Sequence, residues 1–288
     1  MYGLRRTSGA SLALTAEHDA LVRPRRRRID WAAFDPAGHD ARALDAAAAL
    51  WAGRARQELC SLAHVGELAT VARRLGAPLD WSGALARVST DEVRHVDLCL
   101  RLCEALGRPE VPTVDPDDLT RLPPTATLAD LRLELIATMC IGETISGRAL
   151  RRTLRATDVP LVRDVVRAIL VDEAFHGPLG WELAALTMRG DGAALADERA
   201  ALAQELPRLF AEHAAVCGAI AGPAWARRAP EAPPGPNFGQ LTAAGYARAF
   251  FDAMDADIVP SLVAIGLPEA EPAYAALLAT LPDAPPAG

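Results

Sequence analysis

Two short segments of the chain share the pattern Asp-Glu-x-x-His, at residues 91–95 and 172–176. In an α-helix, a Glu and a His three positions apart lie on the same face, one turn from each other. Each segment therefore directs one carboxylate and one imidazole toward the same place. Carboxylate oxygen and imidazole nitrogen together suit iron in its Fe(II) and Fe(III) states. The pattern predicts four metal ligands: Glu92, His95, Glu173 and His176.

A further glutamate lies upstream of each motif, within an apolar helical pattern. Glu58 falls in a stripe of apolar residues at three- and four-residue steps that runs from Trp51 to Ala72. Glu143 lies in a second such pattern. A carboxylate on an apolar face is costly unless it is paired or bound to a metal, so both are predicted as ligands. Glu67 lies on the opposite side of the same helix and remains the alternative to Glu58.

Four carboxylates and two histidines from four helices resemble the metal centre of the ferritin-like di-iron carboxylate superfamily. The Asp-Glu-x-x-His form is similar to that of di-iron oxygenases and of the ribonucleotide reductase small subunit. The resemblance implies two iron ions as cofactors, with manganese as the alternative in one position. It also implies these roles: bridging by Glu92 and Glu173, terminal ligation by Glu58 and Glu143, and one ion each for His95 and His176.

In each motif an aspartate directly precedes the glutamate. It is therefore rotated by about 100° around the helix axis, toward a neighbouring helix. A metal-bound imidazole usually donates its other N–H to a carboxylate that does not bind the metal. We expect Asp172 to hold His95 and Asp91 to hold His176.

Small residues near the predicted ligands could leave room for O2 and an organic substrate. Ser146 and Gly147 follow Glu143 by one turn, and Cys99 follows His95 by one turn. The ribonucleotide reductase small subunit has a radical tyrosine where this chain has Cys99, so the chain departs from that protein here. The alternative for these small residues is close packing in the core and between helices.

Capping residues, prolines and apolar stripes predict an all-α fold. We expect a ferritin-like four-helix bundle over residues 40–190, with a long crossover at 108–124 between its second and third helices. Residues 1–39 are expected to form an irregular N-terminal arm. Residues 191–288 are expected to add C-terminal helices that pack on the bundle, with a Pro-rich linker near 222–240.

The first, third and fourth bundle helices are predicted at 40–75, 127–156 and 160–189, and the second is predicted to start near Pro78 and to run to about Gly107. Asp40 and Thr127 are the predicted N-caps of the first and third helices, and Gly76 is the predicted end of the first. Pro178 lies inside the fourth helix, where it either bends the helix beside His176 or ends a helix segment.

The overall composition excludes several classes of protein. A net charge of −7 argues against a general nucleic-acid-binding surface. No uncharged apolar run is long enough to suggest a membrane span. The five cysteines are odd in number and include no Cys-x-x-Cys, which favours reduced thiols in a cytoplasm.

An arginine stripe on the predicted third helix is a candidate docking surface, formed by Arg148, Arg151, Arg152 and Arg155. It would suit an acidic carrier protein or reductase, and a solvated face is the alternative. No flavin, nicotinamide or iron–sulfur motif is visible, so electrons would come from an external donor. An Ala-rich bundle of this kind is also expected to form a homodimer through its helix faces.

These features predict an O2-activating di-iron oxidoreductase that acts on a small organic substrate, as a monooxygenase, hydroxylase, desaturase or N-oxygenase. The first alternative is a ferritin-like protein that oxidises iron or reduces peroxide. The second is a non-enzymatic bundle that binds a ligand or partner and uses its metal for stability.

Overall fold

The structure is a computed structural model that describes residues 1–3, 18–23, 28–109, 112–189, 193–282 and 284. These residues are predominantly helical, which confirms the all-α prediction. Within them, no helix combines the length and the apolar character needed to cross a membrane. The chain forms two compact units: unit 1 comprises Met1–Leu131, Thr157–Asp172 and Pro236–Gln240, and unit 2 comprises Arg132–Ala156, Glu173–Gly235 and Leu241–Gly288.

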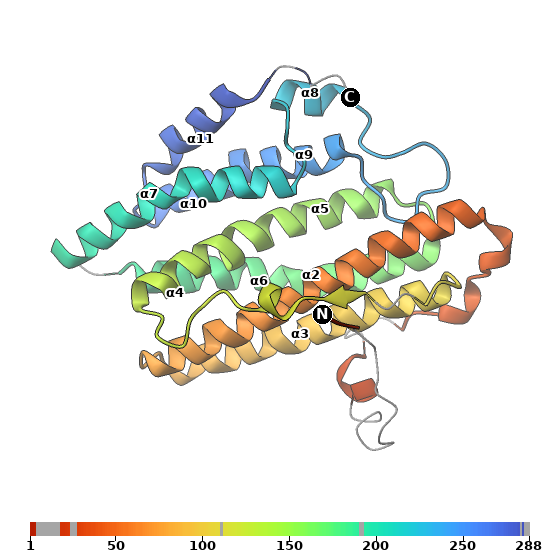
Figure 1. Cartoon of the computed structure of the whole chain (residues 1–288), viewed down its shortest axis with the longest axis horizontal. Helices are drawn as coiled ribbons and strands as arrows, with labels where there is room; N and C mark the ends of the chain where they lie inside the picture. The colour runs from red at the N-terminus through yellow and green to blue at the C-terminus, as the bar shows by residue number, and fades with distance from the viewer. Residues whose placement is uncertain (4–17, 24–27, 110–111, 190–192, 283, 285–288) are drawn as a thin grey trace. The chain divides into compact units, whose positions relative to one another are not determined.

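A hairpin of two long helices dominates unit 1. α2 (Ala41–Arg74) begins at Asp40, whose carboxylate accepts a hydrogen bond from the Ala43 amide at 2.9 Å, as an N-cap does. The chain then turns at Gly76, whose φ of 79° is readily adopted by glycine. α3 (Leu79–Ala105) returns alongside α2 (Figure 1). The first helix therefore begins and ends where its sequence predicts.

Short elements occupy the segments of unit 1 that were predicted to be irregular. β1 (Tyr2–Gly3) and β2 (Thr113–Val114) pair as antiparallel strands. Residues 4–17 and 24–27 of the predicted N-terminal arm lie outside the described residues. Three 3-10 turns complete these segments: η1 (Trp31–Ala33), η2 (Pro36–Gly38) and η3 (Pro116–Leu119).

The predicted third helix contains a π-helix. α4 (Leu128–Glu134) leads into the π-helix η4 (Leu135–Gly142), and α5 (Glu143–Ala156) follows directly. A π-helix pairs each N–H with the carbonyl five residues earlier and so accommodates an extra residue. The helix is therefore longer by one residue than a regular α-helix that spans the same distance.

α6 (Pro160–Thr187) continues through Pro178, so this proline does not end the helix. The boundary between the two units falls within α6, between Asp172 and Glu173. One continuous helix therefore supplies side chains to both units.

The C-terminal helices enclose the apolar core of unit 2. α9 (Ala243–Ala253) packs against α5, and α11 (Ala270–Thr280) packs against α7 (Ala193–Val216). Fully buried aromatic side chains fill the space among them, including Phe210 and Phe250.

Shorter elements complete unit 2. α8 (Pro223–Arg228) is a helical segment within the stretch that was predicted to be a Pro-rich linker, and it packs against α9. The π-helix η5 (Met254–Ile258) and α10 (Val259–Ala264) follow α9.

Candidate metal centre

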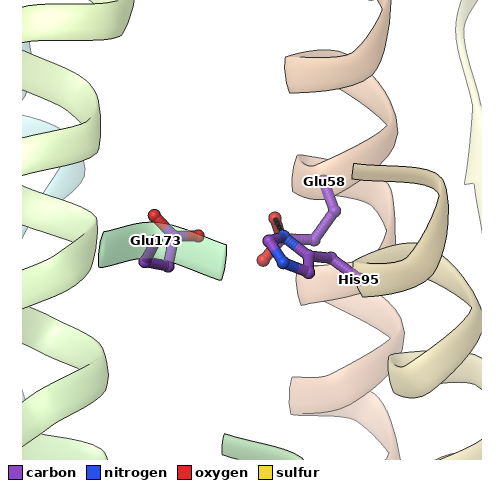
Figure 2. Close-up of side chains that lie close together, drawn as sticks. All are labelled: Glu58, His95 and Glu173. Atoms are coloured by element: carbon purple, nitrogen blue, oxygen red, sulfur yellow. Dashed lines mark ion pairs between the residues drawn. The ribbon is translucent and has the colours of Figure 1, made fainter. Parts of the chain in front are cut away.

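Unit 1 contains a buried group of two glutamates and one histidine. Glu58 comes from α2, and Glu92 and His95 come from α3. The His95 Nδ1 atom lies 3.5 Å from the nearest oxygen of each glutamate. Figure 2 shows the His95 ring directly beside the Glu58 carboxylate. His95 and Glu92 are at most 1% exposed and Glu58 is 7% exposed, so these polar groups are shielded from water.

The charges in this group favour a bound cation. Burial alone would raise the pKa of Glu58, but His95 and Arg54 lower it to about 2. Burial alone would lower the pKa of His95, but the carboxylates of Asp172, Glu58 and Glu92 raise it well above its usual value. Both shifts reflect the attraction between the buried carboxylates and the positively charged groups beside them. A divalent metal ion could supply positive charge to the same carboxylates.

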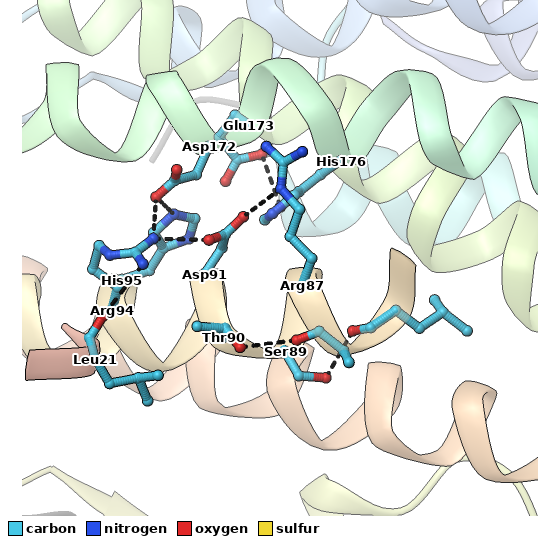
Figure 3. A network of polar contacts seen from close by, with 12 residues as sticks. Leu21, Arg87, Ser89, Thr90, Asp91, Arg94, His95, Asp172, Glu173 and His176 are labelled. Atoms are coloured by element: carbon cyan, nitrogen blue, oxygen red, sulfur yellow. Dashed lines mark hydrogen bonds and ion pairs between the residues drawn. The ribbon is translucent and has the colours of Figure 1, made fainter. Parts of the chain in front are cut away.

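A buried arginine organises the aspartates of unit 1. Arg94 Nη1 donates to Asp91 Oδ1 at 2.8 Å and to Asp172 Oδ2 at 2.7 Å (Figure 3). Its other nitrogens donate to the backbone carbonyls of Leu21 and Arg23 at 3.3 and 3.1 Å. Arg94 is only 4% exposed, so its contacts with the two carboxylates are shielded from solvent.

Asp172 lies where the sequence predicts a partner for His95. Its Oδ2 atom is 3.6 Å from His95 Nε2, on the opposite side of the ring from the glutamates. Burial and Asp91 raise the pKa of Asp172, but contact with His95 and Arg94 lowers it further than they raise it. Asp91 contacts Arg94 and, at 3.7 Å, Arg87. The hydrogen bond expected between Asp91 and His176 remains a prediction.

Sequence reasoning did not identify Arg94 as part of this site. A signal was present, because Arg94 lies three residues after Asp91 and therefore on the same helix face. The second motif has Phe175 at the equivalent position, so the pattern shared by the two motifs does not include the arginine.

Unit 2 contains a second group of the same composition. Glu143 is the first residue of α5, and Glu173 and His176 come from α6. His176 Nδ1 lies 3.9 Å from Glu143 Oε2 and 3.9 Å from Glu173 Oε2. His176 is fully buried and the side chain of Glu143 is 11% exposed. We call the two groups the unit 1 triad (Glu58, Glu92, His95) and the unit 2 triad (Glu143, Glu173, His176).

All six predicted ligands belong to groups of buried or half-buried acidic and histidine side chains that could hold a metal ion. Glu67, the alternative to Glu58, is placed differently. One of its carboxylate oxygens accepts hydrogen bonds from the backbone amides of Arg121 and Leu122 at 2.9 and 3.1 Å. Glu67 therefore anchors the crossover between α3 and α4.

The small residues predicted to line a substrate pocket differ in their surroundings. Cys99 is fully buried in unit 1, and burial and the nearby Glu58 raise the pKa of its thiol well above the usual value. In unit 2, Gly147 is buried and Ser146 is half-buried. A Cβ at Gly147 would meet only the end of the flexible Arg151 side chain, at 3.5 Å. Close helix packing therefore does not require glycine at position 147.

The arginine stripe on α5 is partly used within unit 2. Arg148 Nε donates to Asp257 Oδ2 at 2.8 Å. Arg152 pairs with Glu231 at 2.9 Å and also with Asp252. The remaining members of the stripe, Arg151 and Arg155, are exposed.

Comparison of the chain with protein-family models, with curated proteins and with solved structures gives no match.

Proposed function

We propose that this protein is an O2-activating, non-haem di-iron oxidoreductase of the ferritin-like type that acts on a small organic substrate. The observation that carries this proposal is the presence of two triads, each made of two glutamates and one histidine, in which every residue is buried except the half-buried Glu143. In the proposed centre the two triads together would hold two metal ions. Glu92 and Glu173 would serve as shared ligands, and Glu58 and Glu143 as terminal ligands.

The continuity of α6 supports a shared centre. Asp172 belongs to the polar network around His95, and the next residue, Glu173, belongs to the unit 2 triad. Adjacent residues of one helix thus take part in both groups.

The donor atoms fit iron. Carboxylate oxygens and imidazole nitrogens are the ligands of dinuclear iron and manganese centres, whereas none of the six side chains is a soft thiolate. Four carboxylates would neutralise the charge of two divalent ions. Burying the carboxylates and the ions together therefore costs less free energy than burying either of them alone. When bound, two irons would supply the electrons that activate O2.

Neighbouring side chains would orient the metal ligands and shield them from water. Asp172 fixes the His95 ring through Nε2, and Arg94 fixes Asp172. The buried positions of the ligands exclude bulk water, which would otherwise compete for reactive species. An external donor would supply further electrons, and the exposed Arg151 and Arg155 offer a positively charged surface to an acidic reductase or carrier.

Metal analysis with matched variants tests the proposal. Wild-type protein loaded anaerobically with Fe(II) should retain about two irons per chain, the content of a dinuclear centre. Glu58→Ala and Glu173→Ala should lose iron, whereas Glu67→Ala should retain it, because Glu67 bonds to the crossover backbone on the same helix as Glu58. Equal iron contents in Glu58→Ala and Glu67→Ala would contradict the assignment of the unit 1 triad.

Activity then separates the possible functions. The loaded, reduced protein should consume O2 and oxidise a member of a panel of small organic compounds. Turnover of Fe(II) or H2O2 with no organic compound would favour a ferritin-like oxidase or peroxide-reducing protein. Iron that raises the melting temperature without oxidation of any added compound would favour a metal-stabilised binding bundle.

A further inference from the structure

The π-helix η4 ends directly before Glu143, the first residue of α5. The Glu143 amide donates to the carbonyl of Thr138, five residues earlier, and also to that of Cys140. In a regular α-helix the same amide would donate to Met139, four residues earlier. The π-helix thus inserts a residue before Glu143 and sets the direction in which α5 presents its carboxylate.

His213 of α7 contacts this π-helix. Its Nε2 atom lies 3.0 Å from the carbonyl oxygen of Ala137. Because a carbonyl oxygen can only accept a hydrogen bond, the imidazole is the donor. The His213 ring also lies beside Gly142, where a Cβ would be 3.9 Å from the ring carbon Cε1. One side chain therefore contacts the π-helix at two places, the second adjacent to Glu143.

α6 contacts the same π-helix at another point. A Cβ at Gly180 would lie 2.3 Å from the carbonyl oxygen of Met139, so the backbone of α6 passes close to this carbonyl. In a regular α-helix the Met139 carbonyl would accept a hydrogen bond from the Glu143 amide. The indole of Trp181 donates to the Thr144 hydroxyl at 3.2 Å, and that hydroxyl donates to the Cys140 carbonyl at 2.5 Å. The π-helix is thus braced from α6 and from α7.

We propose that His213 is a positioning residue that holds η4 as a π-helix, so that Glu143 can bind metal together with His176. This inference rests on the dinuclear centre proposed above. It assigns a role to a histidine outside the two triads. Without a hydrogen-bond donor to the Ala137 carbonyl, the position of the inserted residue can shift along the helix. Moving it past Glu143 turns that carboxylate by about 100° around the helix axis, away from His176.

A pair of His213 variants tests this role. His213→Phe keeps an aromatic ring beside Gly142 but removes the donor, whereas His213→Gln keeps an N–H donor. In anaerobic Fe(II) titrations, His213→Phe should bind one iron as the wild type does and the second on the order of 10- to 100-fold more weakly, as expected when a residue that positions a ligand is lost. His213→Gln should bind the second iron nearly as tightly as the wild type.

His64→Phe is the matched control. His64 also contacts a backbone carbonyl, that of Asp118 at 3.3 Å, but it is in unit 1 and outside the triad. Its substitution should leave both binding steps unchanged. If His213→Phe does not fold, as shown by circular dichroism, His213→Asn replaces it, because the shorter side chain carries the same kind of donor but cannot reach Ala137.

The outcomes separate the two proposals. Two irons bound by the wild type and, with unchanged affinities, by a folded His213→Phe or His213→Asn would overturn the role of His213 and leave the dinuclear centre in place. Equal weakening of both binding steps would also overturn it, because the π-helix that His213 contacts leads directly into Glu143, which is a proposed ligand of one iron. Absence of iron binding by the wild type would overturn the dinuclear centre and, with it, this inference.

Discussion

Arg94 donates hydrogen bonds to two buried aspartates in unit 1, Asp91 and Asp172. It bonds to Asp91 and Asp172 through one nitrogen, and Asp172 in turn lies against His95. Removing one partner of a buried ion pair leaves the other charge uncompensated, which costs more than the pair itself contributes. The orientation of His95 therefore depends on a residue that would not touch the metal.

Arg94→Met should lower the free energy of unfolding by about 3–5 kcal/mol, the usual effect of breaking a buried ion pair. Arg167→Met is the control: Arg167 is largely exposed and pairs with Asp164 at 3.2 Å, so its loss should cost less than about 1 kcal/mol. Denaturant unfolding of the metal-free proteins measures both values. Similar values for the two variants would show that the Arg94 network contributes little.

Burial also determines the reactivity of the cysteines. Cys99, Cys103, Cys140 and Cys217 are buried, whereas Cys60 is half-buried. Burial raises the pKa of the Cys217 thiol to about 12. Because a thiol is deprotonated only as the pH approaches its pKa, only about one Cys217 in 10,000 is a thiolate at pH 8.

Iodoacetamide at pH 8 should therefore modify the folded protein at Cys60 alone, and all five cysteines after denaturation. Peptide mass spectrometry locates the modified residues. Cys60→Ser should make the folded protein unreactive. Rapid modification of Cys217 in the folded protein would be incompatible with its buried position.

Residue spacing was sufficient to predict the six candidate ligands, because helical periodicity fixes which residues share a face. Glu58 and Glu67 could not be separated with certainty in this way, since both lie on one long helix. The difference between them comes from tertiary contacts, with His95 for Glu58 and with the crossover amides for Glu67. Arg94 was missed because its second aspartate partner, Asp172, is distant in sequence.

At the scale of elements, the close approach of α6 to the π-helix makes a specific demand on Gly180. A Cβ at Gly180 would meet the Met139 carbonyl oxygen at 2.3 Å and its carbon at 2.6 Å, and the backbone can move only at a cost. A Cβ at the exposed Gly66, in the middle of α2, would meet no atom within 4 Å outside its own stretch of helix. Packing therefore requires the absence of a side chain at Gly180 but not at the other glycine.

Gly180→Ala should destabilise the protein by about 1–3 kcal/mol through overpacking. Gly66→Ala should instead stabilise it by about 0.5–1 kcal/mol, because alanine restricts the unfolded chain and favours a helix. Thermal and denaturant unfolding distinguish the two signs. Stabilisation by Gly180→Ala would mean that α6 does not pack against the Met139 carbonyl.

The helices themselves could be predicted from caps and apolar stripes, but the π-helix could not. Residues 135–142 have the composition of an ordinary buried helix, and an extra residue within a turn leaves no mark on local propensity. The π-helix contacts His213 and Gly180, which come from later parts of the chain. Such contacts are visible only once the tertiary structure is known.

At the scale of the whole molecule, the two units divide the chain in a way that sequence periodicity does not reveal. Their boundaries cross α4 and α6, which are continuous helical patterns in the sequence. Metal binding by side chains from both units, as proposed here, would link the stability of each unit to the same ligand.

Removal of metal should therefore lower the melting temperature of the whole protein. A ligand present at 100 times its dissociation constant stabilises a folded protein by about 2.7 kcal/mol. Calorimetry before and after chelation should show this loss for the wild type and for Glu67→Ala, but not for Glu58→Ala. A wild-type melting temperature unaffected by chelation, in protein shown to contain iron beforehand, would mean that the metal does not contribute to folding.

The π-helix before Glu143 also has an evolutionary consequence. Since it differs from an α-helix by one inserted residue, deletion of a single residue within 135–142 would restore regular hydrogen bonding. The shortened chain would gain local helix stability and lose the direction of its Glu143 carboxylate. In the metal centre proposed here, the length of this segment would therefore be constrained independently of residue type, with helix stability favouring the shorter chain and metal binding by Glu143 favouring the longer one.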